Sequence, residues 1–182
     1  EMYSIAKQRA RSVPASLTLH DGQVLDGIAV IHTPGHCPGQ VCLRIGDVLL
    51  SADHVLPRTT PHQSPESITA WTGLGHYLDS LVKIARVDGI RLALGGHEAP
   101  FENFYPRIDE IRADHERKLD RIHGFLADPG GATIEELRHR MYPAVRDWNV
   151  LLALTEIGAH VEYLFERGAL RVANVADLAA DG

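Results

Sequence analysis

Short apolar runs bounded by turn residues dominate the first half of the chain. Runs of four or five residues between Gly, Pro and Asp are too short for typical helices and predict β-strands. Where Gly46-Asp47 alone separates two runs, the sequence predicts a two-residue hairpin. The predicted strands cover residues 16–20, 28–32, 41–45, 48–51 and 90–94.

Apolar residues at helical spacing follow these runs. The set Leu74, Tyr77, Leu78, Leu81 and Ala85 lies on one face of a helix, so the sequence predicts an amphipathic helix here. Strands and helices therefore alternate, which favours an α/β (α+β) fold.

The last third of the chain favours helices. An apolar stripe at residues 108–125 ends before Asp-Pro-Gly-Gly at 128–131. Thr133 and Glu136 have capping-box spacing and open a short helix. A second long stripe covers residues 151–164.

The order of these elements suggests a second domain. Residues 169–175 form a small apolar segment that suggests a strand or hairpin. A helix, a short helix, a longer helix and a hairpin together are typical of a winged-helix domain. We therefore expect a first domain at 1–106 and a winged-helix-like domain at 107–182.

Composition excludes several classes of partner. The 182 residues carry a formal charge of −6, and residues 128–182 hold five Arg against nine Asp or Glu, which argues against a nucleic-acid surface. No apolar run is long enough to span a bilayer, and no secretory leader pattern is present, so we expect a cytoplasmic protein with no membrane partner. Cys37 and Cys42 make no disulfide framework.

Three loops carry residue types that bind metals. His36 stands between the two Pro-Gly pairs of residues 34–39, Asp53 ends a predicted strand, and His97 follows Gly95-Gly96. For His36 alone, a simple turn and a ligand platform are both open interpretations. Three such residues at three strand ends indicate a metal site.

The segments that carry these residues resemble the metal motifs of the metallo-β-lactamase superfamily. Residues 33–39 (TPGHCPG), 52–56 (ADHVL) and 95–98 (GGHE) are similar to its third, fourth and fifth motifs. The resemblance points to members with a winged-helix tail. It implies the C-terminal half of an αββα sandwich, followed by the winged-helix-like domain.

The resemblance also implies roles for these residues. His36 would complete a zinc site, His97 would bind a second metal, and Asp53 would bridge the two as the catalytic carboxylate. Zinc is the implied cofactor, with manganese or iron as alternatives. In such enzymes a metal-activated hydroxide attacks a thioester, lactone or related bond of a small-molecule substrate. His54 and His62 are candidates for supporting the metal ligands or for substrate contact, against plain pocket-lining or surface roles.

One motif of the superfamily is missing. No H-x-H-x-D-H sequence precedes His36, so we expect a fragment of a longer hydrolase that is inactive alone. Half a sandwich would expose an apolar sheet face, and we expect it to associate with the missing N-terminal half or with another copy of the chain. The alternatives are a non-catalytic binding or assembly module and a part of a single-strand RNA endonuclease. His115, in an apolar helical stripe, is expected to be an interface histidine.

Overall fold

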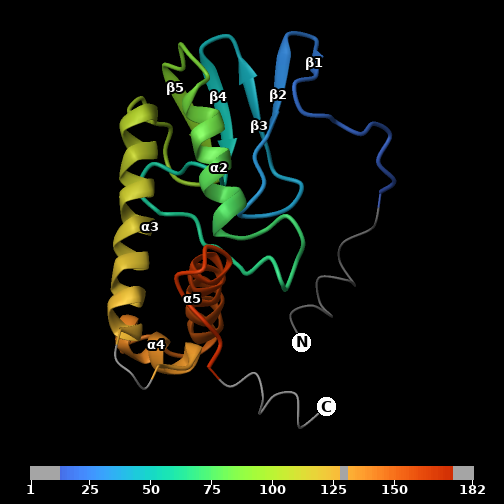
Figure 1. Cartoon of the computed structure of the whole chain (residues 1–182). Coiled ribbons are helices and arrows are strands. Elements are labelled where there is room, and N and C mark those ends of the chain that lie inside the picture. The colour runs from blue at the N-terminus through green and yellow to red at the C-terminus, as the bar shows by residue number, and fades with distance from the viewer. Residues whose placement is uncertain (1–12, 128–130, 174–182) are drawn as a thin grey trace.

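The computed structural model describes residues 13–127 and 131–173, which contain five strands and four helices (Figure 1). The strands are β1 (Val24–Leu25), β2 (Ile28–His32), β3 (Val41–Ile45), β4 (Val48–Ala52) and β5 (Leu92–Gly95). The helices are α2 (Leu74–Ala85), α3 (Phe104–Leu126), α4 (Ile134–Met141) and α5 (Trp148–Glu166). None of the described helices combines the length and hydrophobicity that a bilayer crossing requires.

The strands form one mixed sheet in the order β1-β2-β3-β4-β5. The first four strands pair antiparallel with their neighbours, and Gly46-Asp47 forms the predicted hairpin between β3 and β4. β5 pairs parallel with β4, so the chain must cross over between them, and α2 lies in that crossover.

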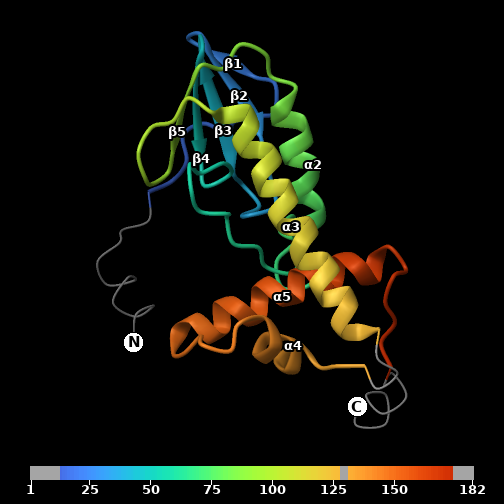
Figure 2. The same ribbon diagram turned by 90° about the vertical axis from the view of Figure 1, so that its left-hand side faces the viewer.

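Helices α2 and α3 cover one face of the sheet, and α4 and α5 lie beyond one end of it (Figure 2). Cys42, Leu49 and Ala93 turn inward from the strands and are fully buried in the core. Tyr77 from α2 and Phe104 from α3 fill the same core. Burying these side chains stabilises the fold by about 1.5–3 kcal/mol for each large apolar residue.

The opposite face of the sheet is also apolar but contributes nothing to that core. Side chains of cross-strand partners lie on the same face of a sheet. On this face they form two rows across β2–β5: Ile28, Ile45, Val48 and Leu92, and Val30, Leu43, Leu50 and Leu94. Ile45 is 46% exposed, and only Val30 of the eight is fully buried. No described helix packs on this face.

A second, smaller core joins the C-terminal helices. Ile122 of α3, Leu137 and Met141 of α4 and Ile157 of α5 form it. Helix α4 begins with the predicted capping box, since Thr133 and Glu136 bond each other's backbone N–H groups. Helix α3 contributes to both cores, because Ile108 packs under the sheet and Ile122 packs on α4 and α5.

Most predicted elements are confirmed, with β2 and β3 at the predicted bounds. The strand predicted at residues 16–20 is wrong: these residues are exposed and pair with no strand. β1 at Val24–Leu25 pairs with β2 instead, because Asp26 and Gly27 both adopt positive φ and make the tight turn. Residues 169–173 contain no strand, and the rest of the predicted hairpin segment lies outside the described residues.

Candidate metal centre

The loop that carries His36 is held against the start of α2. Gly35 has φ +131°, and a Cβ added there would lie 2.4 Å from the Tyr77 Cα, so only glycine permits this close approach. The Gly73 N–H donates to the Gly35 carbonyl at 3.1 Å, and the Ser80 hydroxyl donates to the Pro34 carbonyl at 2.8 Å. The first Pro-Gly pair, Pro34-Gly35, is therefore fixed against α2.

The His36 ring is oriented by a backbone carbonyl. Its Nδ1 lies 2.7 Å from the His62 carbonyl oxygen. A carbonyl oxygen can only accept, so Nδ1 carries the hydrogen and a neutral ring presents the lone pair of Nε2. Metal-binding histidines are commonly oriented by such a bond from the other ring nitrogen.

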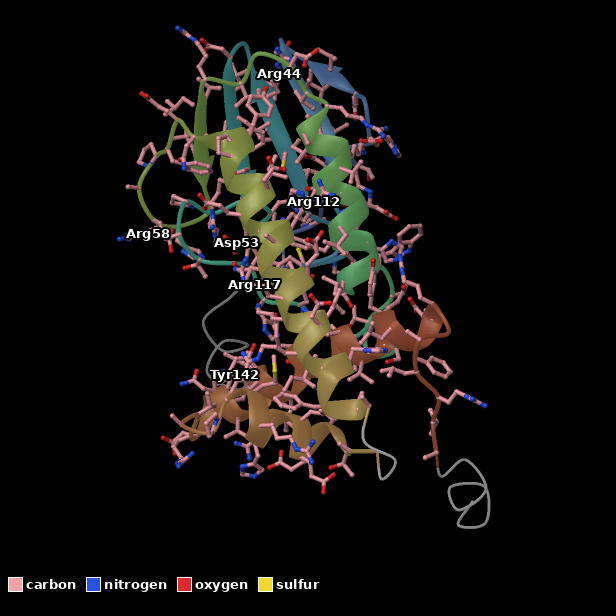
Figure 3. All side chains as sticks on the ribbon, turned by 60° about the vertical axis from the view of Figure 1, so that its left-hand side comes forward. Arg44, Asp53, Arg58, Arg112, Arg117 and Tyr142 are labelled. Carbon is pink, nitrogen blue, oxygen red and sulfur yellow. The ribbon has the colours of Figure 1, made fainter. Side chains whose placement is uncertain are left out.

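Asp53 and His97 meet where β4 and β5 end side by side. The His97 Nε2 lies 3.6 Å from the Asp53 Oδ1. Ala52, just before Asp53, has φ +47°, a strained conformation of the kind that clusters at functional sites. A Cβ on Gly96 would lie 2.4 Å from the Asp53 Oδ1, so any other residue at position 96 would collide with the Asp53 carboxylate as it is placed. Figure 3 shows Asp53 beyond the sheet, at the end nearer α5.

These residues fit a metal such as zinc. The Asp53 Oδ1 is buried and has no hydrogen-bond partner among the described residues, although a buried acceptor normally has one. Two imidazoles and a carboxylate are a donor set that zinc, iron and manganese accept. The ligand atoms of His36, Asp53 and His97 do not all lie within 4.8 Å of one another. As placed here, the three side chains therefore do not form one compact three-ligand group.

His54 and His62 differ in burial and in their contacts. His54 is fully buried beside Tyr77, with ring centroids 5.1 Å apart, and burial lowers its pKa to about 3. Neither of its ring nitrogens has a hydrogen-bond partner in the described part of the chain. His62 is half-buried, and its backbone carbonyl contacts the His36 ring.

The loop between β4 and α2 is attached at its start by α3. The buried Arg107 donates to the carbonyls of Leu56 at 2.8 Å and Arg58 at 2.9 Å. The Glu98 carboxylate, next to His97, accepts from the Arg58 N–H at 3.0 Å. The loop therefore stays beside the candidate ligands.

Two carboxylates of α5 hold the rest of the loop. Glu156 accepts from the Gln63 N–H at 2.7 Å. Glu162 accepts from the N–H groups of Glu66 at 2.6 Å and Ser67 at 2.9 Å. Helix α5 thus fixes a segment of the loop that also contacts His36.

A second group of ligand-type side chains lies between α3 and α5. His115, Glu156 and His160 are buried, and one ligand atom of each lies within 4.8 Å of the others, so they could hold a metal ion. The His115 Nδ1 lies 3.0 Å from the His160 Nε2, and the His160 Nδ1 donates to the Glu156 carbonyl at 2.7 Å. The prediction for His115 included no such partners. The signal available in the sequence was Glu156 and His160 at i, i+4 on one helix face.

Lys118 already neutralises this second group. Its Nζ lies 2.9 Å from the Glu156 Oε1. Burial alone would raise the pKa of the Glu156 carboxyl, but the hydrogen bond from His62 and the charge of Lys118 outweigh it and hold that pKa well below its usual range. A metal ion here would have to compete with the Lys118 ammonium.

Comparisons with known proteins agree with the fold. Residues 15–133 match the family model described as the metallo-beta-lactamase superfamily. A metallo-beta-lactamase family protein from Thermus thermophilus is 29% identical, with a TM-score of 0.77 over 92% of this chain and 55% of that one. A beta-lactamase domain protein from Burkholderia ambifaria is 26% identical, with a TM-score of 0.78 over 87% of this chain and 49% of that one.

The chain therefore spans about half the length of both solved structures. No curated protein matches it. The family model covers well over half of the chain and contains the three candidate ligands His36, Asp53 and His97. The chain belongs to the metallo-beta-lactamase superfamily.

Proposed function

We propose that this chain supplies one side of the metal centre of a zinc-dependent hydrolase. The observation that carries the proposal is the Asp53 Oδ1, a buried acceptor with no hydrogen-bond partner among the described residues, 3.6 Å from the His97 Nε2. His36, with Nδ1 bonded to a carbonyl, would offer its Nε2 from the neighbouring loop. Zinc bound there would supply a Lewis acid and lower the pKa of a bound water.

Each of the three candidate ligands would contribute differently to metal binding. Asp53 brings the negative charge that favours a divalent cation, and His97 offers an exposed ring beside it. His36, on a rigid loop, would approach the metal from a third direction. The remaining ligands of a two-metal centre would come from outside this set. We infer that the chain alone binds one zinc weakly and is inactive or nearly so.

The proposed substrate is a small molecule with a thioester, lactone or related bond. The loop of residues 57–67, which is attached to α3 and α5, would form the wall of the substrate site. A non-catalytic binding or assembly module is the alternative function, favoured by the bare apolar sheet face. A role in a single-strand RNA endonuclease would need the winged-helix-like arrangement of residues 107–182, and the acidic charge of that region argues against it.

Zinc titration of the isolated chain, followed by calorimetry, tests the metal proposal. We expect one equivalent of zinc to bind, and His97→Ala to lower the affinity more than tenfold, since losing a ligand should cost at least as much as losing a residue that orients one. His20→Ala, at an exposed histidine in the segment before β1, is the control. Equal zinc binding by both variants would rule the site out and favour the binding module.

The apolar face of the sheet supports a proposal on partners. We propose that the two aliphatic rows across β2–β5 are covered by the further half that the similar solved structures contain or, in its absence, by a second copy of this chain. Contiguous apolar patches of this kind seldom remain uncovered in monomers. Sedimentation of the isolated chain should show self-association, which Leu43→Lys combined with Leu92→Lys should abolish. A monomer at all concentrations would contradict the proposal.

A further inference from the structure

One peptide group connects α5 to the candidate metal centre. The carbonyl of His62 and the N–H of Gln63 belong to the same peptide plane, which is rigid and directs the two groups to opposite sides. The Glu156 Oε2 accepts from the Gln63 N–H at 2.7 Å, and the His36 Nδ1 donates to the His62 carbonyl at 2.7 Å. This single plane is therefore held by a carboxylate at one side and by the His36 ring at the other.

We propose that Glu156 is a positioning residue of the metal centre: it fixes the His62–Gln63 peptide plane and thereby holds the His36 ring with Nε2 toward the metal. The inference rests on the proposed function, because it assigns His36 as a ligand. In this role Glu156 is not a ligand of that metal, and it acts on His36 through the His62–Gln63 segment.

The surroundings of Glu156 suit this role. The side chain is buried and ionised, with Lys118 Nζ 2.9 Å from Oε1 and His62 Nδ1 3.2 Å from Oε2. A hydrogen bond to an ionised acceptor is stronger than one between neutral groups, and it polarises the peptide so that its carbonyl becomes a better acceptor. The His62 ring is also tied to α5, since its Nε2 lies 3.0 Å from the Thr155 Oγ1. The peptide therefore has little freedom to rotate.

Glu162 provides a matched control on the same helix and the same loop. It also accepts two backbone N–H groups, those of Glu66 and Ser67, and it is half-buried. These peptides lie three or more residues beyond the carbonyl that His36 uses. If the α5 carboxylates only anchor the loop, Glu156→Gln and Glu162→Gln should have similar effects on His36.

The first measurement is the tautomer of His36 in the metal-free protein, by ¹⁵N NMR of the imidazole nitrogens, with His36→Gln to assign the signals. The wild type should show the Nδ1–H form. Glu156→Gln should convert His36 to a mixture of tautomers and weaken zinc binding about tenfold, as the loss of a residue that orients a metal ligand does. Glu162→Gln should keep the wild-type tautomer and bind zinc within threefold of the wild type.

A double variant supplies a rescue. In Glu156→Gln the new amide faces both a Lys118 ammonium and a backbone N–H, and its single oxygen can serve only one of them. Adding Lys118→Met removes that competition, so the amide oxygen should return to the Gln63 N–H and restore the Nδ1–H form of His36.

Several results would overturn the inference. A wild-type His36 in the Nε2–H form does so without any variant, which keeps the test decisive should Glu156→Gln fail to fold. Equal changes in Glu156→Gln and Glu162→Gln, or an unchanged His36 tautomer in Glu156→Gln, also do so. If the wild type shows the expected tautomer but binds no zinc, the proposed function fails while the orientation of His36 by Glu156 can still be measured.

Discussion

Two histidine-containing clusters border the loop between β4 and α2, and they differ in how their charge is satisfied. In the first, His97 and Asp53 are partly exposed at the strand ends, and a buried oxygen of Asp53 has no partner among the described residues. In the second, His115 and Glu156 are buried between helices, and Lys118 has already paired with the carboxylate.

This difference separates a site that lacks a cation from one that contains its own. Both clusters combine imidazoles with a carboxylate, so residue types alone do not distinguish them. An ionised carboxylate inside a protein requires a compensating charge. The ammonium of Lys118 provides it for the buried Glu156. Asp53, whose side chain is 40% exposed, has no Lys or Arg in ion-pair contact among the described residues and meets solvent instead. We call Asp53 with its neighbours His36 and His97 the open cluster, and His115, Glu156 and His160 the closed cluster. The open cluster is therefore the better candidate for an exchangeable metal.

The largest effect should come from removing the internal cation. Lys118→Met leaves the Glu156 carboxylate buried without its ammonium, and breaking a buried pair in this way costs about 3–5 kcal/mol of unfolding free energy. Lys83→Met, which removes a surface pair with Asp21 whose side chains are 42% and 51% exposed, should cost about 0–1 kcal/mol. Chemical denaturation measures both.

The same variant should turn the closed cluster into a metal site. With Lys118 gone, His115, Glu156 and His160 can offer their ligand atoms to zinc without competition. Added zinc should then raise the melting temperature of Lys118→Met in an Asp53→Ala background, where the open site is disabled. If Lys118→Met is as stable as the wild type, or gains nothing from zinc, the contrast between the clusters is wrong.

Removing the uncompensated carboxylate should have the next largest effect. Asp53→Ala should weaken zinc binding about a hundredfold, because losing the only charged ligand should equal or exceed the loss of a residue that merely orients one. Without zinc it should leave stability unchanged or raise it, since a buried acceptor without a partner disappears. Asp109→Ala, at an exposed position on α3, should change neither. A destabilised Asp53→Ala that still binds zinc would assign Asp53 a structural role.

The sequence pointed to all three candidate ligands near the strand ends, whereas for the cluster between α3 and α5 it offered only Glu156 and His160 at i, i+4. His36, Asp53 and His97 each follow a strand within a few residues, so local turn signals and motif spacing single them out as candidates. His115 and His160 meet only because α3 crosses α5, which periodicity along one helix does not specify.

The same distinction applies to the fold. The apolar stripe that predicted α2 is a local property of one helix. The failed strand at residues 16–20 had a strand-like pattern but no partner to bond, and pairing depends on the whole sheet.

Acid should destabilise the closed cluster in a defined direction. Burial lowers the pKa of His115 to about 3 from an ordinary 6.5, next to His160, Glu156, Lys118 and Asp114. Between these two pKa values the unfolded chain binds a proton at His115 and the folded protein does not. The contribution of His115 to the unfolding free energy is therefore complete above pH 6.5 and is lost as the pH falls toward 3. In this range His115 should contribute about 1.4 kcal/mol per pH unit to the slope of the unfolding free energy against pH.

Denaturation at several pH values between about 7 and 4 measures this slope. His115→Leu should reduce the slope by the equivalent of about one bound proton, which is about 1.4 kcal/mol per pH unit. His20→Leu, at an exposed histidine, should leave the slope unchanged. An unchanged slope in His115→Leu would mean that His115 titrates alike in the folded and unfolded chain.

The smallest effect should be seen at Cys37, which reports the charge of the open cluster. Partial burial, and then the negative charge of Asp53, raise the pKa of this thiol above its usual value. Only the thiolate reacts with iodoacetamide, so Cys37 should react more slowly than a free cysteine peptide at about pH 8. Removing the charge in Asp53→Asn should accelerate the reaction a few-fold, and zinc should accelerate it in the wild type by neutralising Asp53.

Cys42, which is fully buried with a pKa of about 12, should not react and serves as the internal control. If Asp53→Asn and zinc both leave the rate unchanged, Asp53 is already neutralised in the folded protein, and the open cluster would resemble the closed one.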